Sequence, residues 1–119
     1  MIGIDIIEIS RIRALLNDSA FIQKVYTDKE VTYCRATKSK TVMAQRFAAR
    51  FAAKEAIFKA IPAMKALVWK EIEITNEASG KPVVHFLGKS HQLMKKTGLS
   101  LEISLSHSRN YAVAAAILK

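Results

Sequence analysis

Residues 42–61 read VMAQRFAARFAAKEAIFKAI, a stretch with helical spacing of its apolar residues, rich in alanine and without glycine or proline. Pro62 follows at once, and proline cannot continue the hydrogen-bond ladder of a helix. The stretch therefore predicts the longest helix of the chain, ending at about Ile61.

One side of this predicted helix carries a lysine among large apolar residues. On a helical wheel Lys54 falls near the middle of the apolar stripe, and Glu55 lies at its edge. The stripe consists of Phe47, Phe51, Phe58 and Ile61. Burial of an unpaired ammonium is costly or lowers its pKa, so we expect an anion or a hydrated cleft near Lys54.

Other charged residues of the helix lie four apart, which is the spacing of helical side-chain neighbours. Arg50 precedes Lys54 by four residues, and Glu55 precedes Lys59 by four, so one acid lies within a basic patch. The patch has two interpretations. It is either a solvated helix face with an ordinary surface ion pair or part of a functional site.

The N-terminus predicts a buried strand that contains an acid. Isoleucines surround Asp5 over residues 2–7, a β-branched run typical of a strand. Asp5 then either lies at a strand end, bonded to backbone donors, or faces a site. Two carboxylates, Asp5 from a strand and Glu55 from a helix, with lysines close by, suit a magnesium ion completed by substrate phosphates.

Further elements follow from local patterns. Thr27 and Glu30 have the spacing of a capping box, which predicts a helix from about Asp28. The remaining predictions are a helix over 8–16, a hairpin of strands 70–75 and 83–87 around the turn residues 78–82, a short helix over 89–97, and strands over 101–106 and 111–118. This order of elements indicates an α+β fold.

The serines and histidine of residues 104–107 (SLSH) do not favour a serine hydrolase. The serines point opposite to His107 in a strand, and no glycine pattern of a nucleophile elbow surrounds them. From its parity alone, His107 is interpreted as a hydrogen-bonded histidine at the edge of the core. Residues 80–82 (GKP) form a turn first of all, although Lys81 can also face a phosphate.

Composition narrows the class of protein. The chain has 119 residues, half of them apolar, which suffices for one core without disulfides. A lone cysteine, Cys34, fits a reducing cytosol, and we expect neither an export signal nor a membrane helix. The net charge of +9 favours a polyanionic partner, namely nucleic acid, a phosphorylated cofactor or an acidic protein.

Four motifs occur in register along nearly the whole chain, and together they are highly specific. They are residues 3–6 (GIDI), residues 50–56 (RFAAKEA) with Lys59, residues 80–82 (GKP) and residues 104–107 (SLSH). The chain closely resembles the holo-acyl-carrier-protein synthases, the small trimeric type of 4'-phosphopantetheinyl transferase. The resemblance implies a single α+β domain over residues 1–119, with a small antiparallel sheet packed against a long central helix and shorter helices.

The resemblance also implies a reaction. A serine hydroxyl of an apo-acyl carrier protein attacks the β-phosphate of coenzyme A, which transfers the phosphopantetheine arm, releases adenosine 3',5'-bisphosphate and supports fatty acid biosynthesis. Magnesium polarises the phosphate and stabilises the leaving group. The base is either Glu55 or a water on the metal.

Residue roles carry over by matching positions. Asp5 and Glu55 match the family's magnesium ligands, and Lys59 matches the lysine beside the reacting phosphate, so these three are the expected catalytic residues. The positions expected around the coenzyme's phosphates and adenosine end are Arg50, Lys54, Lys81, Pro82 and His107.

The implied partners are coenzyme A and an acidic carrier protein. Arg11 and Arg13 match the family's docking surface, and the excess of positive charge would steer the carrier protein toward it. A homotrimer with active sites between subunits is implied too, in the cytoplasm, without nucleic acid or membrane. The chain departs from the family over residues 61–69 (IPAMKALVW), where a glycine-rich segment is usual.

Two rival functions remain to be separated from this one. A basic nucleic-acid-binding module fits the charge, but the sequence has neither zinc-finger spacing nor an aromatic sheet motif. A family member that has lost catalysis and only binds carrier protein would give Asp5, Glu55 and Lys59 no reason to occur together. Metal-dependent turnover distinguishes this second rival from an enzyme.

Overall fold

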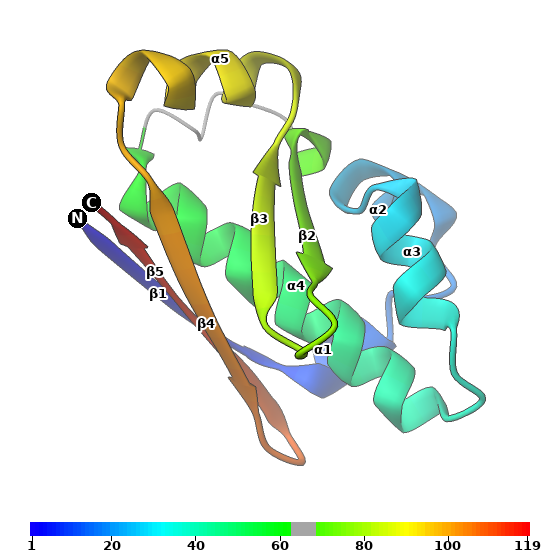
Figure 1. Cartoon of the computed structure of the whole chain (residues 1–119). Coiled ribbons are helices and arrows are strands. Elements are labelled where there is room, and N and C mark those ends of the chain that lie inside the picture. Colours follow the sequence, from blue (N-terminus) through cyan, green and yellow to red (C-terminus); the bar gives the residue numbers. More distant parts are fainter. Residues whose placement is uncertain (63–68) are drawn as a thin grey trace.

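The long helix predicted from the sequence is the centre of the fold. A computed structural model describes residues 1–62 and 69–119 (Figure 1). Helix α4 spans Lys40–Ala60, and the Ser39 side chain caps its start by accepting a hydrogen bond from the Val42 amide. The helix ends just before Pro62, as predicted. The family departure at 61–69 falls largely on residues 63–68, which lie outside the described residues.

A three-stranded antiparallel sheet packs against α4. Its strands are ordered β1 (Ile2–Glu8), β5 (Tyr111–Leu118) and β4 (Leu101–His107), and α4 contacts β1 and β5 along their lengths. The β5 residues that face α4 are Ala112, Ala114 and Ala116, all fully buried. Because these side chains are small, the helix lies close to the sheet.

The tightest contact between sheet and helix is at Gly3. A Cβ at this position would overlap the carbonyl oxygen of Ala56 and lie 2.7 Å from the Ala60 amide nitrogen. Glycine is therefore required here by space, because only a residue without a side chain allows β1 to approach this turn of α4. The approach brings β1 beside the stretch of α4 that carries Glu55 and Lys59.

The prediction that β1 is buried is wrong for one of its faces. Gly3 and Ile7 face α4 and are buried, whereas Ile2, Ile4 and Ile6 are 69%, 62% and 64% exposed. Side chains alternate along a strand, and α4 covers only one face of this sheet. A row of isoleucines is therefore left on the open face.

The remaining helices and a β-hairpin complete the α+β fold that was predicted. Helices α2 (Ser19–Val25) and α3 (Asp28–Arg35) lie on the side of α4 away from the sheet (Figure 1), and Thr27 and Glu30 form the predicted capping box. The other elements are α1 (Ile9–Arg13), a 3-10 helix (Trp69–Glu71), the hairpin of β2 (Ile72–Asn76) and β3 (Pro82–Phe86), and α5 (Gly88–Thr97).

Lys54 lies inside this fold and has the anion that its position requires. Its ammonium is fully buried and lies 2.7 Å from the Glu30 carboxylate. Burial lowers the pKa of Lys54 from the ordinary value of a lysine, and the Glu30 charge opposes that shift. The expectation of a nearby anion is confirmed.

No helix within residues 1–62 and 69–119 has the length and apolar character needed to cross a lipid bilayer.

Candidate active site

The two acids singled out by the sequence line one cavity. Asp5 from β1 and Glu55 from α4 face a cavity of about 240 Å³, together with Arg11 from α1 and the ring of Phe51. Asp5 lies in the middle of β1, opposite Ala114, and not at a strand end. The structure thus brings together two residues that are 50 positions apart in the sequence. A magnesium site made of both carboxylates would require this.

Lys59 connects the helix to the strand at this cavity. Its ammonium donates to the Asp5 carboxylate at 3.1 Å and to the Ile4 carbonyl at 3.0 Å. This ion pair joins α4 to β1. Phe51, Glu55 and Lys59 are the residues of 51–60 that stay partly exposed, so they form one strip along α4.

The donor set of this cavity suits a cation that is only partly coordinated by protein. Among the described residues no group of three or more His, Cys, Asp or Glu side chains converges on a point. Two carboxylates from Asp5 and Glu55 leave most positions of an octahedral ion to water and ligand oxygens. That is the usual arrangement for magnesium bound together with a phosphate ester.

A second cavity, of about 310 Å³, is rich in arginine. Arg46 and Arg50 of α4 line it with Tyr33 of α3 and His107 at the end of β4. Both guanidinium groups lie over the Tyr33 ring, at 4.6 Å and 4.3 Å from its centre. Because two cations share one wall, the cavity suits an anionic ligand.

Arg50 is held firmly in this second cavity. Its side chain is 3% exposed, and Nη2 donates to the Asn76 side chain at 2.6 Å. Nε is buried without a hydrogen-bond partner in the described part of the chain. A buried donor left in this way favours an acceptor from a ligand. His107 is exposed, so its interpretation as a core-edge histidine is wrong.

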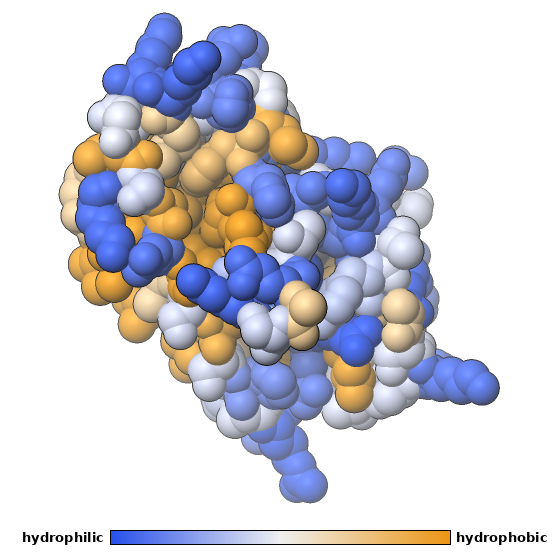
Figure 2. Space-filling model, viewed as in Figure 1, coloured by the Kyte–Doolittle hydropathy of each residue, from blue (hydrophilic) through white to orange (hydrophobic). Residues whose placement is uncertain are grey.

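The predicted GKP turn borders a third hollow. Lys81 and Pro82 line a space of about 270 Å³ between β3 and β4, with Val84 and Ile103 among its apolar residues. Figure 2 shows apolar side chains gathered on the face of the molecule that carries β3 and β4. Gly80, next to Lys81, lines the arginine-rich cavity, so the two hollows meet at this turn.

Known proteins resemble this chain along nearly its whole length. A family model described as the 4'-phosphopantetheinyl transferase superfamily matches residues 1–116. The chain belongs to this superfamily. The holo-[acyl-carrier-protein] synthase of Geotalea daltonii is 39% identical, over 98% of this chain and 95% of its own.

Solved structures agree with the sequence relatives. The Helicobacter pylori holo-[acyl-carrier-protein] synthase, in complex with coenzyme A, superposes with a TM-score of 0.84 at 27% identity and covers 100% of both chains. The Bacillus anthracis synthase, in complex with CoA (3',5'-ADP), has a TM-score of 0.80 at 33% identity and covers 98% of this chain and 93% of its own. The chain is a phosphopantetheinyl transferase of the holo-[acyl-carrier-protein] synthase type, with the fold that the sequence resemblance implied.

The structure of this transferase corrects the expected role of Lys54. A direct contact with a coenzyme phosphate was expected, but its ammonium is 0% exposed. It already donates to Glu30, to the Val25 carbonyl and to the Trp69 carbonyl. A phosphate cannot reach this group without opening the core, so Lys54 is not a coenzyme ligand.

The remaining expected site residues are distributed as follows. Arg11 shares the cavity of Asp5 and Glu55, whereas Arg13 lines a different cavity, with Arg109 and Tyr111. The two arginines are therefore neighbours on α1 that face different hollows. Cys34 is fully buried, and burial raises the pKa of its thiol from 9.0 to about 12, so the transferase does not use it as a nucleophile.

Sequence reasoning missed two residues of the arginine-rich cavity. Arg46 was not selected, although it precedes Arg50 by four residues, the same spacing that drew attention to Lys54. Tyr33 had no signal in the sequence, because only the packing of α3 on α4 places its ring under both arginines.

Proposed function

We propose that this enzyme transfers the 4'-phosphopantetheine arm of coenzyme A to a serine of apo-acyl carrier protein, for fatty acid biosynthesis, and that the whole chain acts as one domain. The observation that carries the proposal is the cavity lined by Asp5 and Glu55, with Lys59 bonded to Asp5 at its edge. Adenosine 3',5'-bisphosphate is the second product.

The first cavity is the place for the reacting phosphate. Asp5 and Glu55 would hold a magnesium ion, which supplies charge neutralisation at the diphosphate and at the leaving group when it is bound. Lys59 keeps the Asp5 carboxylate in place and offers a second positive charge beside it. These are the catalytic residues of the proposal.

The second and third hollows are the place for the rest of the coenzyme. Arg50 and His107 would bind phosphate oxygens, and the buried Nε of Arg50 supports this assignment. Lys81 and Pro82 line the third hollow next to it, where the adenine ring would lie against β3 and β4. We extend the coenzyme-binding set to Arg46 and remove Lys54 from it.

The open face of β1 supports a homotrimer. Ile2, Ile4 and Ile6 form a continuous apolar row, and Ile117 of the neighbouring strand is also exposed. Such a row on a soluble chain suits contact with other copies. Light scattering on the purified protein tests this, because a monomer mass at micromolar concentration would contradict it.

The acidic carrier protein would approach over α1. Arg11 is exposed and lines the first cavity but not the arginine-rich cavity, so a charge reversal there should slow encounter and leave the proposed contacts of Arg50 and His107 in place. We expect Arg11→Glu to lower kcat/KM for the carrier protein about tenfold at low salt, with a smaller loss at high salt. Stopped-flow or initial-rate measurements at several salt concentrations provide the check.

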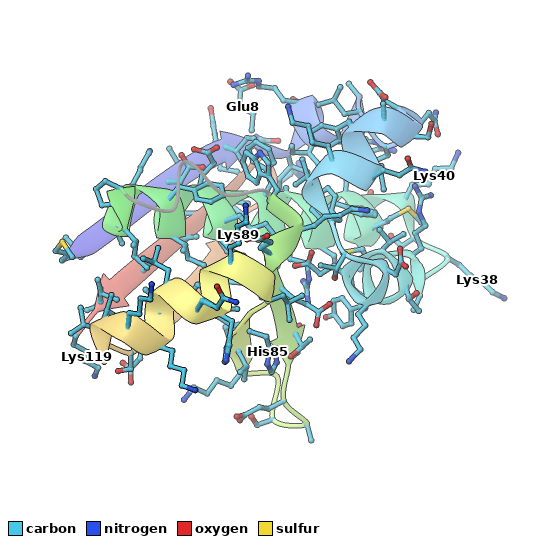
Figure 3. The ribbon with its side chains drawn as sticks, turned by 90° about the horizontal axis from the view of Figure 1, so that it is seen from above. Glu8, Lys38, Lys40, His85, Lys89 and Lys119 are labelled. Atoms are coloured by element: carbon cyan, nitrogen blue, oxygen red, sulfur yellow. The ribbon has the colours of Figure 1, made fainter. Side chains whose placement is uncertain are left out.

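A matched control is an exposed lysine that does not line the first cavity. Lys38 projects from the end of the fold that leads into α4, opposite the end that carries Lys119 (Figure 3). Lys38→Glu makes the same change of charge away from the first cavity. If it slows transfer as much as Arg11→Glu does, docking over α1 is contradicted.

The function itself is tested by a direct transfer assay. Pure enzyme, coenzyme A, magnesium and a fatty-acid-type apo-carrier protein are combined, and the carrier is weighed by intact mass spectrometry. We expect a mass gain of one phosphopantetheine arm that disappears when a chelator is added. A carrier that stays unmodified, in trials with several carriers, would overturn the proposal.

A further inference from the structure

The buried ion pair of Lys54 and Glu30 is not used by the reaction as described so far. Lys54 Nζ donates to Glu30 Oε1 at 2.7 Å, to the Val25 carbonyl at 2.6 Å and to the Trp69 carbonyl at 3.2 Å. Three acceptors therefore share one ammonium that is closed off from solvent. The third acceptor places Trp69 at a fixed point beside α4.

Glu30 connects the same pair to two other elements. Its Oε1 also accepts from the Thr27 amide, and its Oε2 accepts from the Ile74 amide in β2, both at 2.9 Å. Three donors hold this buried carboxylate, which favours one fixed arrangement of the pair. It holds the start of α3, β2 and Trp69 against α4.

The Trp69 ring continues this chain of contacts toward the first cavity. It stacks on Phe51 with ring centres 5.1 Å apart and an angle of 22° between the planes, and it meets Phe58 edge-on at 4.9 Å. Phe51 is half-buried and lines the cavity with Asp5 and Glu55. Trp69 is thus the support behind an apolar wall beside the two acids.

We propose that Lys54, Glu30 and Trp69 are positioning residues of the transfer reaction, which hold the Phe51 ring as the apolar wall of the cavity that receives the carrier serine. The inference rests on the proposed function. A fixed wall keeps the acceptor oriented toward the phosphate, and small displacements of oriented groups lower the rate. Apart from the reacting phosphate, the coenzyme is proposed to bind elsewhere, in the arginine-rich cavity and the hollow next to it.

This separation predicts which kinetic constant changes. Trp69→Leu removes the stacked ring, and we expect kcat to fall about tenfold. The KM for coenzyme A should stay within about twofold of wild type, because Trp69 is not among the residues that line the cavity of Arg46, Arg50 and His107. Trp69→Phe keeps an aromatic ring behind Phe51, so it should restore most of kcat.

The ion pair is tested through the light emitted by Trp69. The chain contains one tryptophan, so its fluorescence reports on this ring alone. The double variant Glu30→Gln with Lys54→Met removes both charges together, so neither charge is left buried without the other. We expect its emission maximum to shift to longer wavelength and its kcat to fall with an unchanged KM for coenzyme A. Lys96→Met, an exposed lysine on α5, is the matched control.

The outcomes separate this inference from the proposed function. If wild-type enzyme transfers the arm but Trp69→Leu keeps full kcat, or Trp69→Phe fails to restore it, the positioning role is overturned. The role is also overturned if the double variant changes the emission and leaves kcat unchanged. If the wild type transfers nothing to any carrier, the proposed function itself has failed.

Discussion

The Glu55→Gln variant is expected to fold normally and to lose at least ~1000-fold in kcat. The substitution removes one of the two carboxylates that are proposed to hold the metal ion beside the reacting phosphate. Glutamine keeps the size and polarity of the side chain, so the change is one of charge at a half-exposed position. Initial rates of arm transfer, followed by the mass of the carrier protein, measure the effect.

Asp5→Asn supplies an internal check on this expectation. If the two carboxylates hold one ion, each single variant should remove most of the contribution of that ion to kcat. The double variant should then be scarcely slower than either single variant. Asp28→Asn is the control, since Asp28 is an exposed acid in the first turn of α3. Metal-dependent transfer that persists at wild-type rate in Glu55→Gln would contradict the assignment.

Gly3→Ala is expected to cost about 3 kcal/mol or more in the free energy of unfolding, because the new methyl group has no room. It would overlap the Ala56 carbonyl oxygen and lie 2.7 Å from the Ala60 amide, and both are backbone atoms of a helix. To relieve the overlap, β1 must move away from α4, which also separates Asp5 from Glu55. Urea unfolding at equilibrium measures the loss.

Gly98→Ala is the matched control for that variant. Gly98 has a φ of +64° and open space around its Cβ position, so alanine there meets only backbone strain. We expect a cost of about 1 kcal/mol for it, from the left-handed conformation alone. Equal losses in the two variants would show that close packing of β1 on α4 is not what requires Gly3.

Most helices and strands could be predicted because they left local signals, but helix α2 (Ser19–Val25) was not predicted, and the helix expected over 8–16 is shorter, Ile9–Arg13. Pro62 stops α4, Thr27 and Glu30 cap α3, and the residues around Gly80 turn the hairpin. These signals involve neighbours in the sequence, so they are visible without the fold. The exposure of β1 was not predictable, because isoleucines look the same whether a sheet face is covered by a helix or left open.

The candidate site was predicted in part for the same physical reason. Asp5 was conspicuous as an acid among isoleucines, and Glu55 as an acid among bases, and the structure brings both to one cavity. Lys54 was conspicuous too, because a buried lysine needs an anion nearby. The anion could come from a ligand phosphate or from the protein, and the sequence alone did not show that it is the Glu30 carboxylate. Only the packing of α3 on α4 decides this.

The two ends of the chain lie side by side. The Met1 amino group donates to the Leu118 carbonyl at 3.1 Å, and β1 and β5 run antiparallel to this point. A few added residues could therefore join the ends into a ring, and the chain could be reopened in the exposed loop between α3 and α4. An affinity tag at either of the present ends would emerge beside Ile2 and Ile117, on the face where copies of the enzyme are proposed to meet. In the circular permutant the new ends, and any tag on them, would lie in the loop between α3 and α4, away from that face.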